Sequence, residues 1–395
     1  MSEYRARFID HIAEVDAAAW NALVSSHALR GAAGQPFLRH EFLSALEQSG
    51  SVAARTGWAP KHLLLEDPRG RMVGAMPLYR KAHSRGEFVF DFSWANAYAE
   101  HGMRYYPKLV SAVPFTPVTG PRLLVGASAD ERTVTAGLIR AASEYARSEH
   151  LSSWHILFPA DEDLTALRQA PLILRRDCQF HWQNRAYESY EDFLATFTAE
   201  KRKKAKRERR RVAEAGIEFD THLGGEMSDD LWRTVYRFYA DTFFRHGHEP
   251  YLNLRFFKLI AASMPECMMI KVARHGREPI AAAIFFVGED ALFGRYWGAS
   301  GNYHSLHFEA CYHQGIEYCI AHGLQRFEPG TQGEHKVPRG FVPTLTSSAH
   351  DIVDARFEAA IRDFAAREAR GVASYAAAVN KHVPYHRAPN EELQL

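Results

Sequence analysis

Apolar residues recur at every second position in some stretches of the chain and at every third or fourth in others, which distinguishes expected strands from expected helices. The turn sequence Asp-Pro-Arg-Gly at 67–70 lies between two apolar runs and predicts a β-hairpin. Taken in order, the first half predicts helices at 16–23 and 40–48, the hairpin at 63–79, a strand at 87–94, a long loop at 98–121, a helix at 129–150 and a strand at 154–158.

The second half repeats this order of elements. The turn sequence His-Gly-Arg-Glu at 275–278 again separates two apolar runs, so that Gly70 and Gly276 occupy equivalent turns. The pattern predicts helices at 189–198, 201–211, 231–244 and 254–264, a hairpin at 267–287, a strand at 291–298, a helix at 305–322 and a strand at 326–328. We therefore predict a duplicated α/β domain, with the first copy at 1–185 and the second at 186–395.

Composition narrows the class of protein. The chain has 395 residues, of which 46% are hydrophobic and 24% charged, as in globular proteins. Its four cysteines form no Cys-x-x-Cys pattern, which favours reduced thiols and a cytoplasmic protein. The N-terminus resembles no secretory signal, and the longest apolar run, near 280–287, is too short to span a bilayer. We expect no membrane insertion.

Positive charge is concentrated in one predicted helix. The run KRKKAKRERRR at 201–211 holds nine basic residues and one acid, a net charge of +8, so the rest of a chain with net charge +1 carries −7. One interpretation is a solvated helix face, and the other is a surface that binds a polyanion such as tRNA. The candidate polyanion-binding residues are Lys201, Arg202, Lys203, Lys204, Lys206 and Arg207.

The stretch FEPGTQGEHKVPRGF at 327–341 is the densest group of reactive side chains. Turn-forming glycines and prolines surround an acid, an imidazole, an amine and a guanidinium, and loops on a rigid scaffold are common places for chemistry. Glu328, Glu334 and His335 are the candidate catalytic bases. Lys336 and Arg339 are candidates for binding a phosphate or carboxylate of a ligand.

Residues from the preceding strand and helix complete a predicted cleft. The candidate substrate-binding residues there are Arg295, Tyr296, Tyr303, His304, His307 and Glu309. His307 and Glu309 are also typical of polar residues in a first helical turn, where an acid is favoured by the helix dipole. Their spacing matches no known zinc pattern, and we predict no metal. The equivalent place in the first half, 160–163, carries no His, Lys or Arg, so the first domain is expected to be a scaffold or acceptor platform.

Two helices, a hairpin, a further strand, a helix and a strand form the order of the GNAT acyltransferase fold. With two copies in tandem, the chain resembles the FemABX group of aminoacyl-tRNA-dependent peptidyltransferases and the bacterial FemAB-like proteins. The resemblance rests on FLATFTAEKRKKAKRERRRV at 193–212, on the strand end Tyr-Trp-Gly at 296–298 leading to Tyr303, and on HKVPRGF at 335–341. It implies an α/β fold of two GNAT-like domains, each a mixed, mostly antiparallel sheet flanked by helices.

One departure from the resemblance leaves the donor open. GNAT enzymes bind the pyrophosphate of coenzyme A with Arg/Gln-x-x-Gly-x-Gly/Ala at a helix start, whereas the sequences here are GASGNYHSL at 298–306 and GASADE at 126–131. Acyl-CoA and aminoacyl-tRNA both remain possible donors, and no cofactor is certain.

Two hypotheses about function follow. The first is an acyltransferase that moves an acyl or aminoacyl group to an amine on a small molecule or peptide, using the second domain. The second is a non-catalytic GNAT-like module that binds tRNA or a small acidic ligand.

Overall fold

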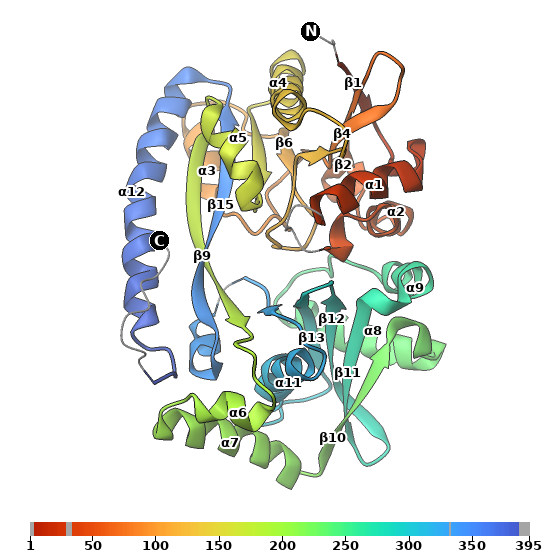
Figure 1. The fold of residues 1–395 in the computed structure, drawn as a ribbon, viewed down its shortest axis with the longest axis vertical. Helices are drawn as coiled ribbons and strands as arrows, with labels where there is room; N and C mark the ends of the chain where they lie inside the picture. Colours follow the sequence, from red (N-terminus) through yellow and green to blue (C-terminus); the bar gives the residue numbers. More distant parts are fainter. Residues whose placement is uncertain (1–3, 29–33, 332, 387–395) are drawn as a thin grey trace. The chain divides into compact units, whose positions relative to one another are not determined.

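The computed structural model describes residues 4–28, 34–331 and 333–386 (Figure 1). The chain forms two compact units: unit 1 contains Met1–Asp177 and Thr346–Val372, and unit 2 contains Cys178–Leu345 and Ala373–Leu395. The first crossing between the units precedes the predicted boundary at 185/186. Residues 346–372 belong to unit 1, whereas the predicted division placed all residues after 185 in the second domain.

Before the first crossing, the described residues of unit 1 form short strands and five α-helices. Its elements are β1 (Arg5–Ile9), α1 (Ala17–Ala28), α2 (His40–Gln48), β2 (Trp58–Pro60), β3 (His62–Glu66), β4 (Met72–Met76), β5 (Tyr79–Lys81), α3 (Phe92–Glu100), β6 (Lys108–Ser111), β7 (Leu124–Val125), α4 (Glu131–Ser148), β8 (Ser153–Leu157) and α5 (Asp161–Gln169). Strands β1, β3, β4 and β7 form one antiparallel sheet. β6 and β8 belong to a second sheet, in which they are parallel to each other. α4 turns its apolar face, including Val134, Leu138 and Ala142, into the core.

Three elements have residues in both units: β9 (Ile173–Gln183), β15 (Val342–Ile352) and α12 (Ala355–Asn380). The remaining elements of unit 2 are α6 (Tyr190–Ala195), α7 (Ala199–Glu214), β10 (Ile217–Leu223), α8 (Asp229–Arg245), α9 (Leu254–Ser263), β11 (Met268–His275), β12 (Glu278–Val287), β13 (Ala291–Ala299), α10 (Leu306–Phe308), the π-helix η6 (Glu309–His313), α11 (Gln314–Ala321), β14 (Arg326–Glu328) and the 3₁₀-helix η7 (Glu334–Arg339). The sheet order in unit 2 is β10-β11-β12-β13-β14-β9.

A parallel strand pair marks the corresponding place in each unit. β6 and β8 are parallel in unit 1, and β13 and β14 are parallel in unit 2, whereas the ladders from β10 to β13 are antiparallel. A helix leads into the second strand of each pair, α4 in unit 1 and α11 in unit 2. This arrangement confirms the predicted mixed, mostly antiparallel sheets flanked by helices.

The strand predicted at 87–94 is wrong. The chain forms a loop there, followed by α3. The burial is the reverse of what the alternation predicts, because acidic side chains are buried and two phenylalanine side chains are exposed. Glu87 and Asp91 are buried while Phe90 and Phe92 are 43% and 49% exposed. The acids point inward because the Lys108 amine, also buried, donates to both. A distant partner therefore reverses the burial that the local pattern predicts.

Two further predictions needed correction. The long loop expected at 98–121 contains the end of α3 and all of β6. The helix expected at 305–322 is interrupted by the π-helix η6, and such wide turns are frequent at functional sites.

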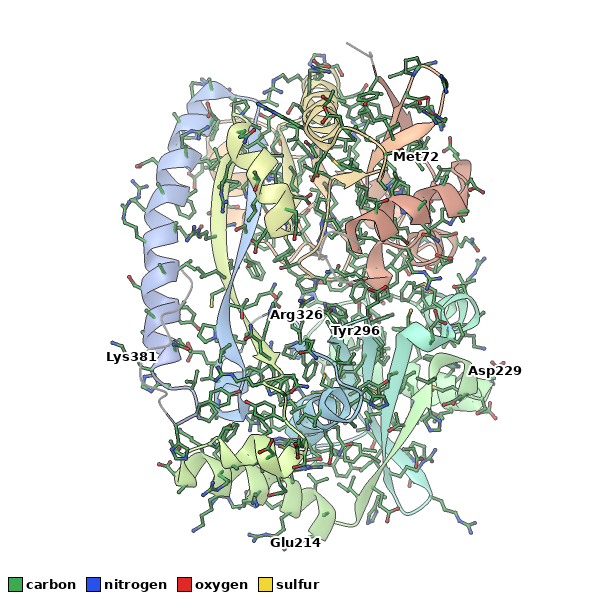
Figure 2. All side chains as sticks on the ribbon, in the orientation of Figure 1. Met72, Glu214, Asp229, Tyr296, Arg326 and Lys381 are labelled. Atoms are coloured by element: carbon green, nitrogen blue, oxygen red, sulfur yellow. The ribbon has the colours of Figure 1, made fainter. Side chains whose placement is uncertain are left out.

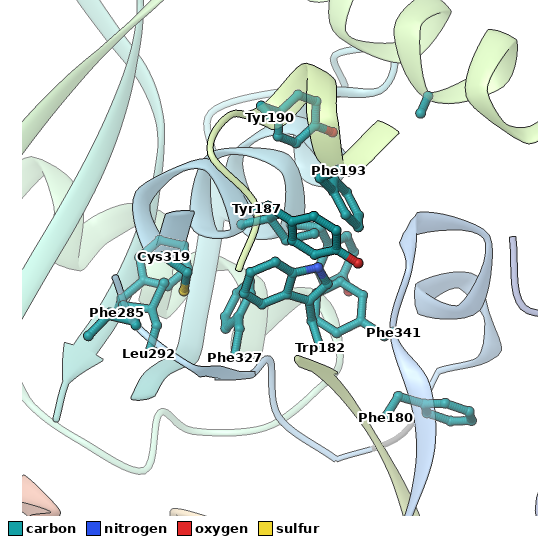
Figure 3. Close-up of a cluster of buried hydrophobic side chains, with 14 of the residues drawn as sticks. Phe180, Trp182, Tyr187, Tyr190, Phe193, Phe285, Leu292, Cys319, Phe327 and Phe341 are labelled. Atoms are coloured by element: carbon teal, nitrogen blue, oxygen red, sulfur yellow. The ribbon is translucent and has the colours of Figure 1, made fainter. Parts of the chain in front are cut away.

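The core of unit 2 fixes both ends of the predicted reactive stretch. Phe327 and Phe341 have no exposed surface, and their rings lie 5.3 Å apart between centroids. Figure 3 shows them in one cluster with Trp182, and Trp182 packs edge-on against Phe193 of α6. Because both anchors are large and fully buried, the two ends of the stretch are fixed in the core of unit 2.

A glycine of β13 allows α8 to pack closely. A Cβ atom at Gly298 would stand 1.9 Å from the carbonyl oxygen of Phe238, a backbone atom that cannot move alone. We predict that Gly298→Ala lowers the free energy of unfolding by about 2–3 kcal/mol, as overpacking does. Gly371→Ala in α12, where a Cβ meets nothing within 4 Å, is expected to raise it by about 0.5–1 kcal/mol. Urea unfolding measures both, and equal values for the two variants would contradict this account.

Candidate active site

The candidate site begins where β13 and β14 separate. β14 pairs with β13 only at Ala291–Phe293. Beyond Phe293, β13 still pairs with β12 but no longer with β14. The register between β12 and β13 shifts at Ile284/Phe285, so that Arg295 is the extra residue of a bulge. Bulges commonly redirect a side chain near an active site. The Arg295 guanidinium donates to the carbonyl oxygens of Gly294 and Glu328, both at 3.0 Å, and so bridges the two separated strands.

A cavity of about 120 Å³ lies at this separation. That volume equals about four water molecules in the liquid, enough for a small group of a substrate. Figure 2 labels Tyr296 on β13 and Arg326 on β14, the two strands that separate. The cavity is lined by Ala283, Ile284, Phe285, Gly294, Arg295, Tyr296, Trp297, His307, Cys311, Tyr312 and Pro329.

His335 lies beside the cavity on η7. Its Nε2 atom is 2.8 Å from the hydroxyl of Tyr312, which lines the cavity, and its ring lies 6.0 Å from that of His307. Burial lowers the pKa of His335 below its ordinary value, and the charges of Lys336 and Arg339 lower it further. Burial also lowers the pKa of His307, to about 4. Both imidazoles are therefore neutral at pH 7.

Lys336 is buried, with 3% of its surface exposed. Its amine donates to the carbonyl oxygens of Gly330 and Thr331 at 2.9 and 2.8 Å. Burial lowers the pKa of Lys336 to about 7, and the charge of Arg295 acts in the same direction. These contacts place Lys336 in the loop interior, where it shapes the turn at 330–331. Gln332 of the same stretch lies outside the described residues.

Arg339 connects the reactive stretch to the basic helix. Its guanidinium donates to both carboxylate oxygens of Glu208 on α7, at 2.6 and 3.0 Å. The same carboxylate lies 3.2 Å from Nε2 of His313, whose Nδ1 is 2.6 Å from the Tyr190 hydroxyl. Burial raises the pKa of Glu208, but the hydrogen bond from His313 and the Arg339 charge outweigh burial and leave that pKa below its ordinary value.

The two predicted catalytic acids differ in burial, and the backbone of Glu328 contacts the Arg295 guanidinium. Glu328 is buried at the end of β14, where Oε1 accepts a hydrogen bond of 2.9 Å from Arg326, while Oε2 has no hydrogen-bond partner within 4–28, 34–331 and 333–386. Glu334 is exposed, and it accepts a hydrogen bond of 2.8 Å from the Tyr375 hydroxyl. Neither side chain lines the cavity.

Lys336 and Arg339 are absent from the cavity lining, and so are three further predicted substrate-binding residues. Tyr303 places its hydroxyl 3.3 Å from that of Ser300, and His304 contacts Ser305 at 2.7 Å. Glu309 is buried and forms an ion pair with Arg209 of α7 at 3.2 Å. The structure thus brings Arg295, Tyr296 and His307 together at the cavity, with His335 beside it.

Several residues that were not predicted as site residues contribute to the site. Trp297, Cys311 and Tyr312 line the cavity, and Glu208 holds Arg339. Glu208 had a signal: it is the single acid within KRKKAKRERRR, and it lies on the buried face of α7 with Ala205 and Val212. The described residues contain no group of three or more His, Cys, Asp or Glu side chains that could hold a metal ion.

The outer face of α7 remains basic. Lys206 is paired with Glu191, and Arg209 with Glu309 and Glu317. For the other predicted polyanion-binding residues, no ion-pair partner exists within the part of the chain that the structure describes. These residues are Lys201, Arg202, Lys203, Lys204 and Arg207.

Comparisons with known proteins define the class. FemX has 10% sequence identity, a TM-score of 0.53, and an alignment that covers 90% of this chain and all of FemX. The C-terminal DUF2156 domain of a protein from Agrobacterium fabrum, named for lysylphosphatidylglycerol synthesis, has 11% identity and a TM-score of 0.54, with 90% of this chain and 96% of that domain covered. No curated protein sequence matches the chain. These likenesses show that the chain shares the fold of FemX and of that domain.

The family follows from the sequence itself. Residues 11–387 match the FemAB-like family, described as peptidoglycan biosynthesis/recognition. The chain belongs to the FemAB-like family. No helix among the described residues is long and apolar enough to cross a membrane.

Proposed function

We propose that acyl transfer takes place at the cavity between β13 and β14 of unit 2, with His335 as the general base. The observation that carries this proposal is the position of the His335 imidazole, whose Nε2 lies 2.8 Å from the hydroxyl of the cavity-lining Tyr312. Burial lowers the pKa of His335, which favours the neutral form. In the tautomer whose Nε2–H donates to Tyr312, Nδ1 keeps the lone pair that accepts the proton of the attacking amine. The Arg295 guanidinium, at the bulge, supplies positive charge for the oxyanion that develops on the acyl carbonyl.

Lys336 acts on His335 through charge. At acidic pH the Lys336 amine is protonated, because its pKa is about 7, and its charge keeps the pKa of His335 low. We predict that Lys336→Met moves the acidic limb of the kcat/KM profile to higher pH, since loss of a neighbouring positive charge raises the pKa of His335. A pH–rate series on the wild type and the variant measures the shift. An unmoved or acid-shifted limb would exclude this role for Lys336.

The corresponding place in unit 1 is occupied by the chain itself. Beyond the parallel pair β6–β8, the buried Arg122 guanidinium donates to the carbonyl oxygens of Val118, Gly120 and Leu157, at 2.6 to 2.9 Å. Asp163 accepts from the backbone N–H groups of Arg122 and Leu123. This filling supports the assignment of transfer to unit 2 and of a scaffold or acceptor role to unit 1.

The basic face of α7 supports aminoacyl-tRNA as the donor, with acyl-CoA as the alternative. Neutralising phosphates releases counterions, so the logarithm of the binding constant falls linearly with the logarithm of salt concentration. We predict that the triple variant Lys203→Gln, Lys204→Gln, Arg207→Gln reduces the slope of that line for tRNA by about 2–3, near 0.7–0.9 for each lost contact. The matched control Arg255→Gln, an exposed residue of α9, keeps the wild-type slope. An unchanged slope in the triple variant would remove α7 from the binding surface.

The acceptor we propose is an amine on a small molecule or peptide, and the compartment is the cytoplasm of a bacterium. All four cysteines are free thiols, as expected where thiols stay reduced. The direct experiment incubates the purified chain with each donor and a panel of amines and detects product by its mass. Product from one donor is the expected result. Binding of tRNA without product from either donor would favour the non-catalytic module instead.

A further inference from the structure

Unit 1 contains a second, larger cavity that has no part in the transfer site. Helices α4 and α5 pack against each other, and both are labelled in Figure 1. Between them lies a groove of about 610 Å³. That volume falls within the range of small-molecule sites, about 300–1,000 Å³. The groove is lined by Arg132, Thr135, Ala136, Ile139, Arg140, Ser143, Glu144, Arg147, Ala166, Gln169, Ala170, Pro171 and Asp351.

The groove has an apolar floor because small residues line both helices. Ala136 and Ile139 of α4 line the groove together with Ala166 of α5 and with Ala170, which directly follows the end of α5. Residues 132, 136, 140, 143 and 147 recur at three- and four-residue intervals, so they form one stripe along α4. The opposite stripe, Val134, Leu138, Ala142 and Ala146, is buried in the core of unit 1. Alanines in the lining leave room that larger side chains would fill.

Arginines stand along this stripe. Arg147 is paired with Asp351 at 2.9 and 3.0 Å and is therefore neutralised. Arg132 and Arg140 are exposed and have no ion-pair partner among the residues described, and Glu144 is the other acid in the lining. Two unpaired guanidinium groups beside an apolar floor match a ligand that is both apolar and anionic.

We propose that the α4–α5 groove binds an amphiphile with a single alkyl chain and one anionic head group, with the chain on the alanine floor and the head group between Arg132 and Arg140. A peptide fits less well, since both helices satisfy their own backbone hydrogen bonds and leave no strand edge for pairing. The head group is a carboxylate or a phosphate monoester, because each offers oxygens to a guanidinium fork.

The test is a titration of the full chain with four probes: dodecyl phosphate, dodecanoate, dodecyl maltoside and inorganic phosphate. We expect one or both anionic amphiphiles to bind and the neutral amphiphile and inorganic phosphate to fail, and the stronger anionic probe identifies the head group. The double variant Arg132→Gln, Arg140→Gln is expected to weaken binding at least tenfold. Arg168→Gln, an exposed α5 residue outside the lining, is expected to bind as the wild type does.

A second variant tests the floor of the groove. Ala136→Phe places a large side chain in the groove, and binding is expected to be lost. Because position 136 is exposed, the variant is expected to fold, which thermal unfolding measures. Three results would overturn the proposal: no binding of either anionic amphiphile, equal binding of dodecyl maltoside, or full binding by a folded Ala136→Phe variant.

Discussion

His335→Ala is expected to lower kcat/KM for acyl transfer by about 10²–10⁴-fold, the usual contribution of a positioned general base. The imidazole is the neutral base beside the cavity, and alanine leaves Tyr312 without its 2.8 Å partner and the attacking amine without an acceptor for its proton. Added imidazole should restore part of the rate, which a purely structural role of His335 would not allow.

The matched control is His275→Ala. His275 ends β11 in an exposed turn of the same unit, so its loss is expected to leave kcat/KM unchanged. Steady-state kinetics on both variants, with thermal unfolding to confirm that each is folded, measures the difference. Full activity in His335→Ala would remove the site assignment.

Glu208→Ala is expected to destabilise the chain by about 3–5 kcal/mol, because it leaves Arg339 buried without its counter-ion. Arg339 is only 4% exposed, and two charge-assisted hydrogen bonds and the contact with His313 are lost together. The pKa of Glu208 in the folded chain lies below 4.5, its ordinary value. The contribution of Glu208 is therefore present above about pH 4.5 and is lost as pH falls through the folded pKa.

Urea unfolding with two companion variants isolates this effect. Glu214→Ala, at the exposed end of the same helix, is expected to change the free energy of unfolding by less than about 0.5 kcal/mol. The double variant Glu208→Ala, Arg339→Met is expected to recover part of the loss, since no unpaired charge then remains buried. A loss below about 1 kcal/mol in Glu208→Ala, or no recovery in the double variant, would contradict the account.

Much of the fold can be predicted from the sequence because local patterns agree with the tertiary structure. The helix at 40–48 and the strand at 326–328 have the predicted bounds. The two hairpin turns contain Gly70 and Gly276 in the left-handed conformation, with φ of 75° and 61°. The strand expected at 87–94 fails for a physical reason: its alternation is real, but a distant lysine, Lys108, turns the acids inward.

The candidate site is predicted less completely, because contacts across long sequence separations decide it. Arg295 and His307 both line the cavity, but Arg339 is held by Glu208, 131 residues away. Trp297 and Tyr312 follow the same apolar pattern as core residues, so periodicity alone does not identify them as cavity lining. The basic helix was expected at the surface, and its buried acid is what connects it to the site.

Photo-crosslinking tests the central claim, that the cavity of unit 2 receives the acyl group of the donor. A donor whose small acyl group carries a diazirine is bound to the wild-type chain and irradiated, and the labelled peptides are mapped by mass spectrometry. The account predicts label on the cavity-lining residues of β13 and η6, above all Trp297 and Tyr312. Label confined to unit 1, or label that the unmodified donor does not displace, would contradict it.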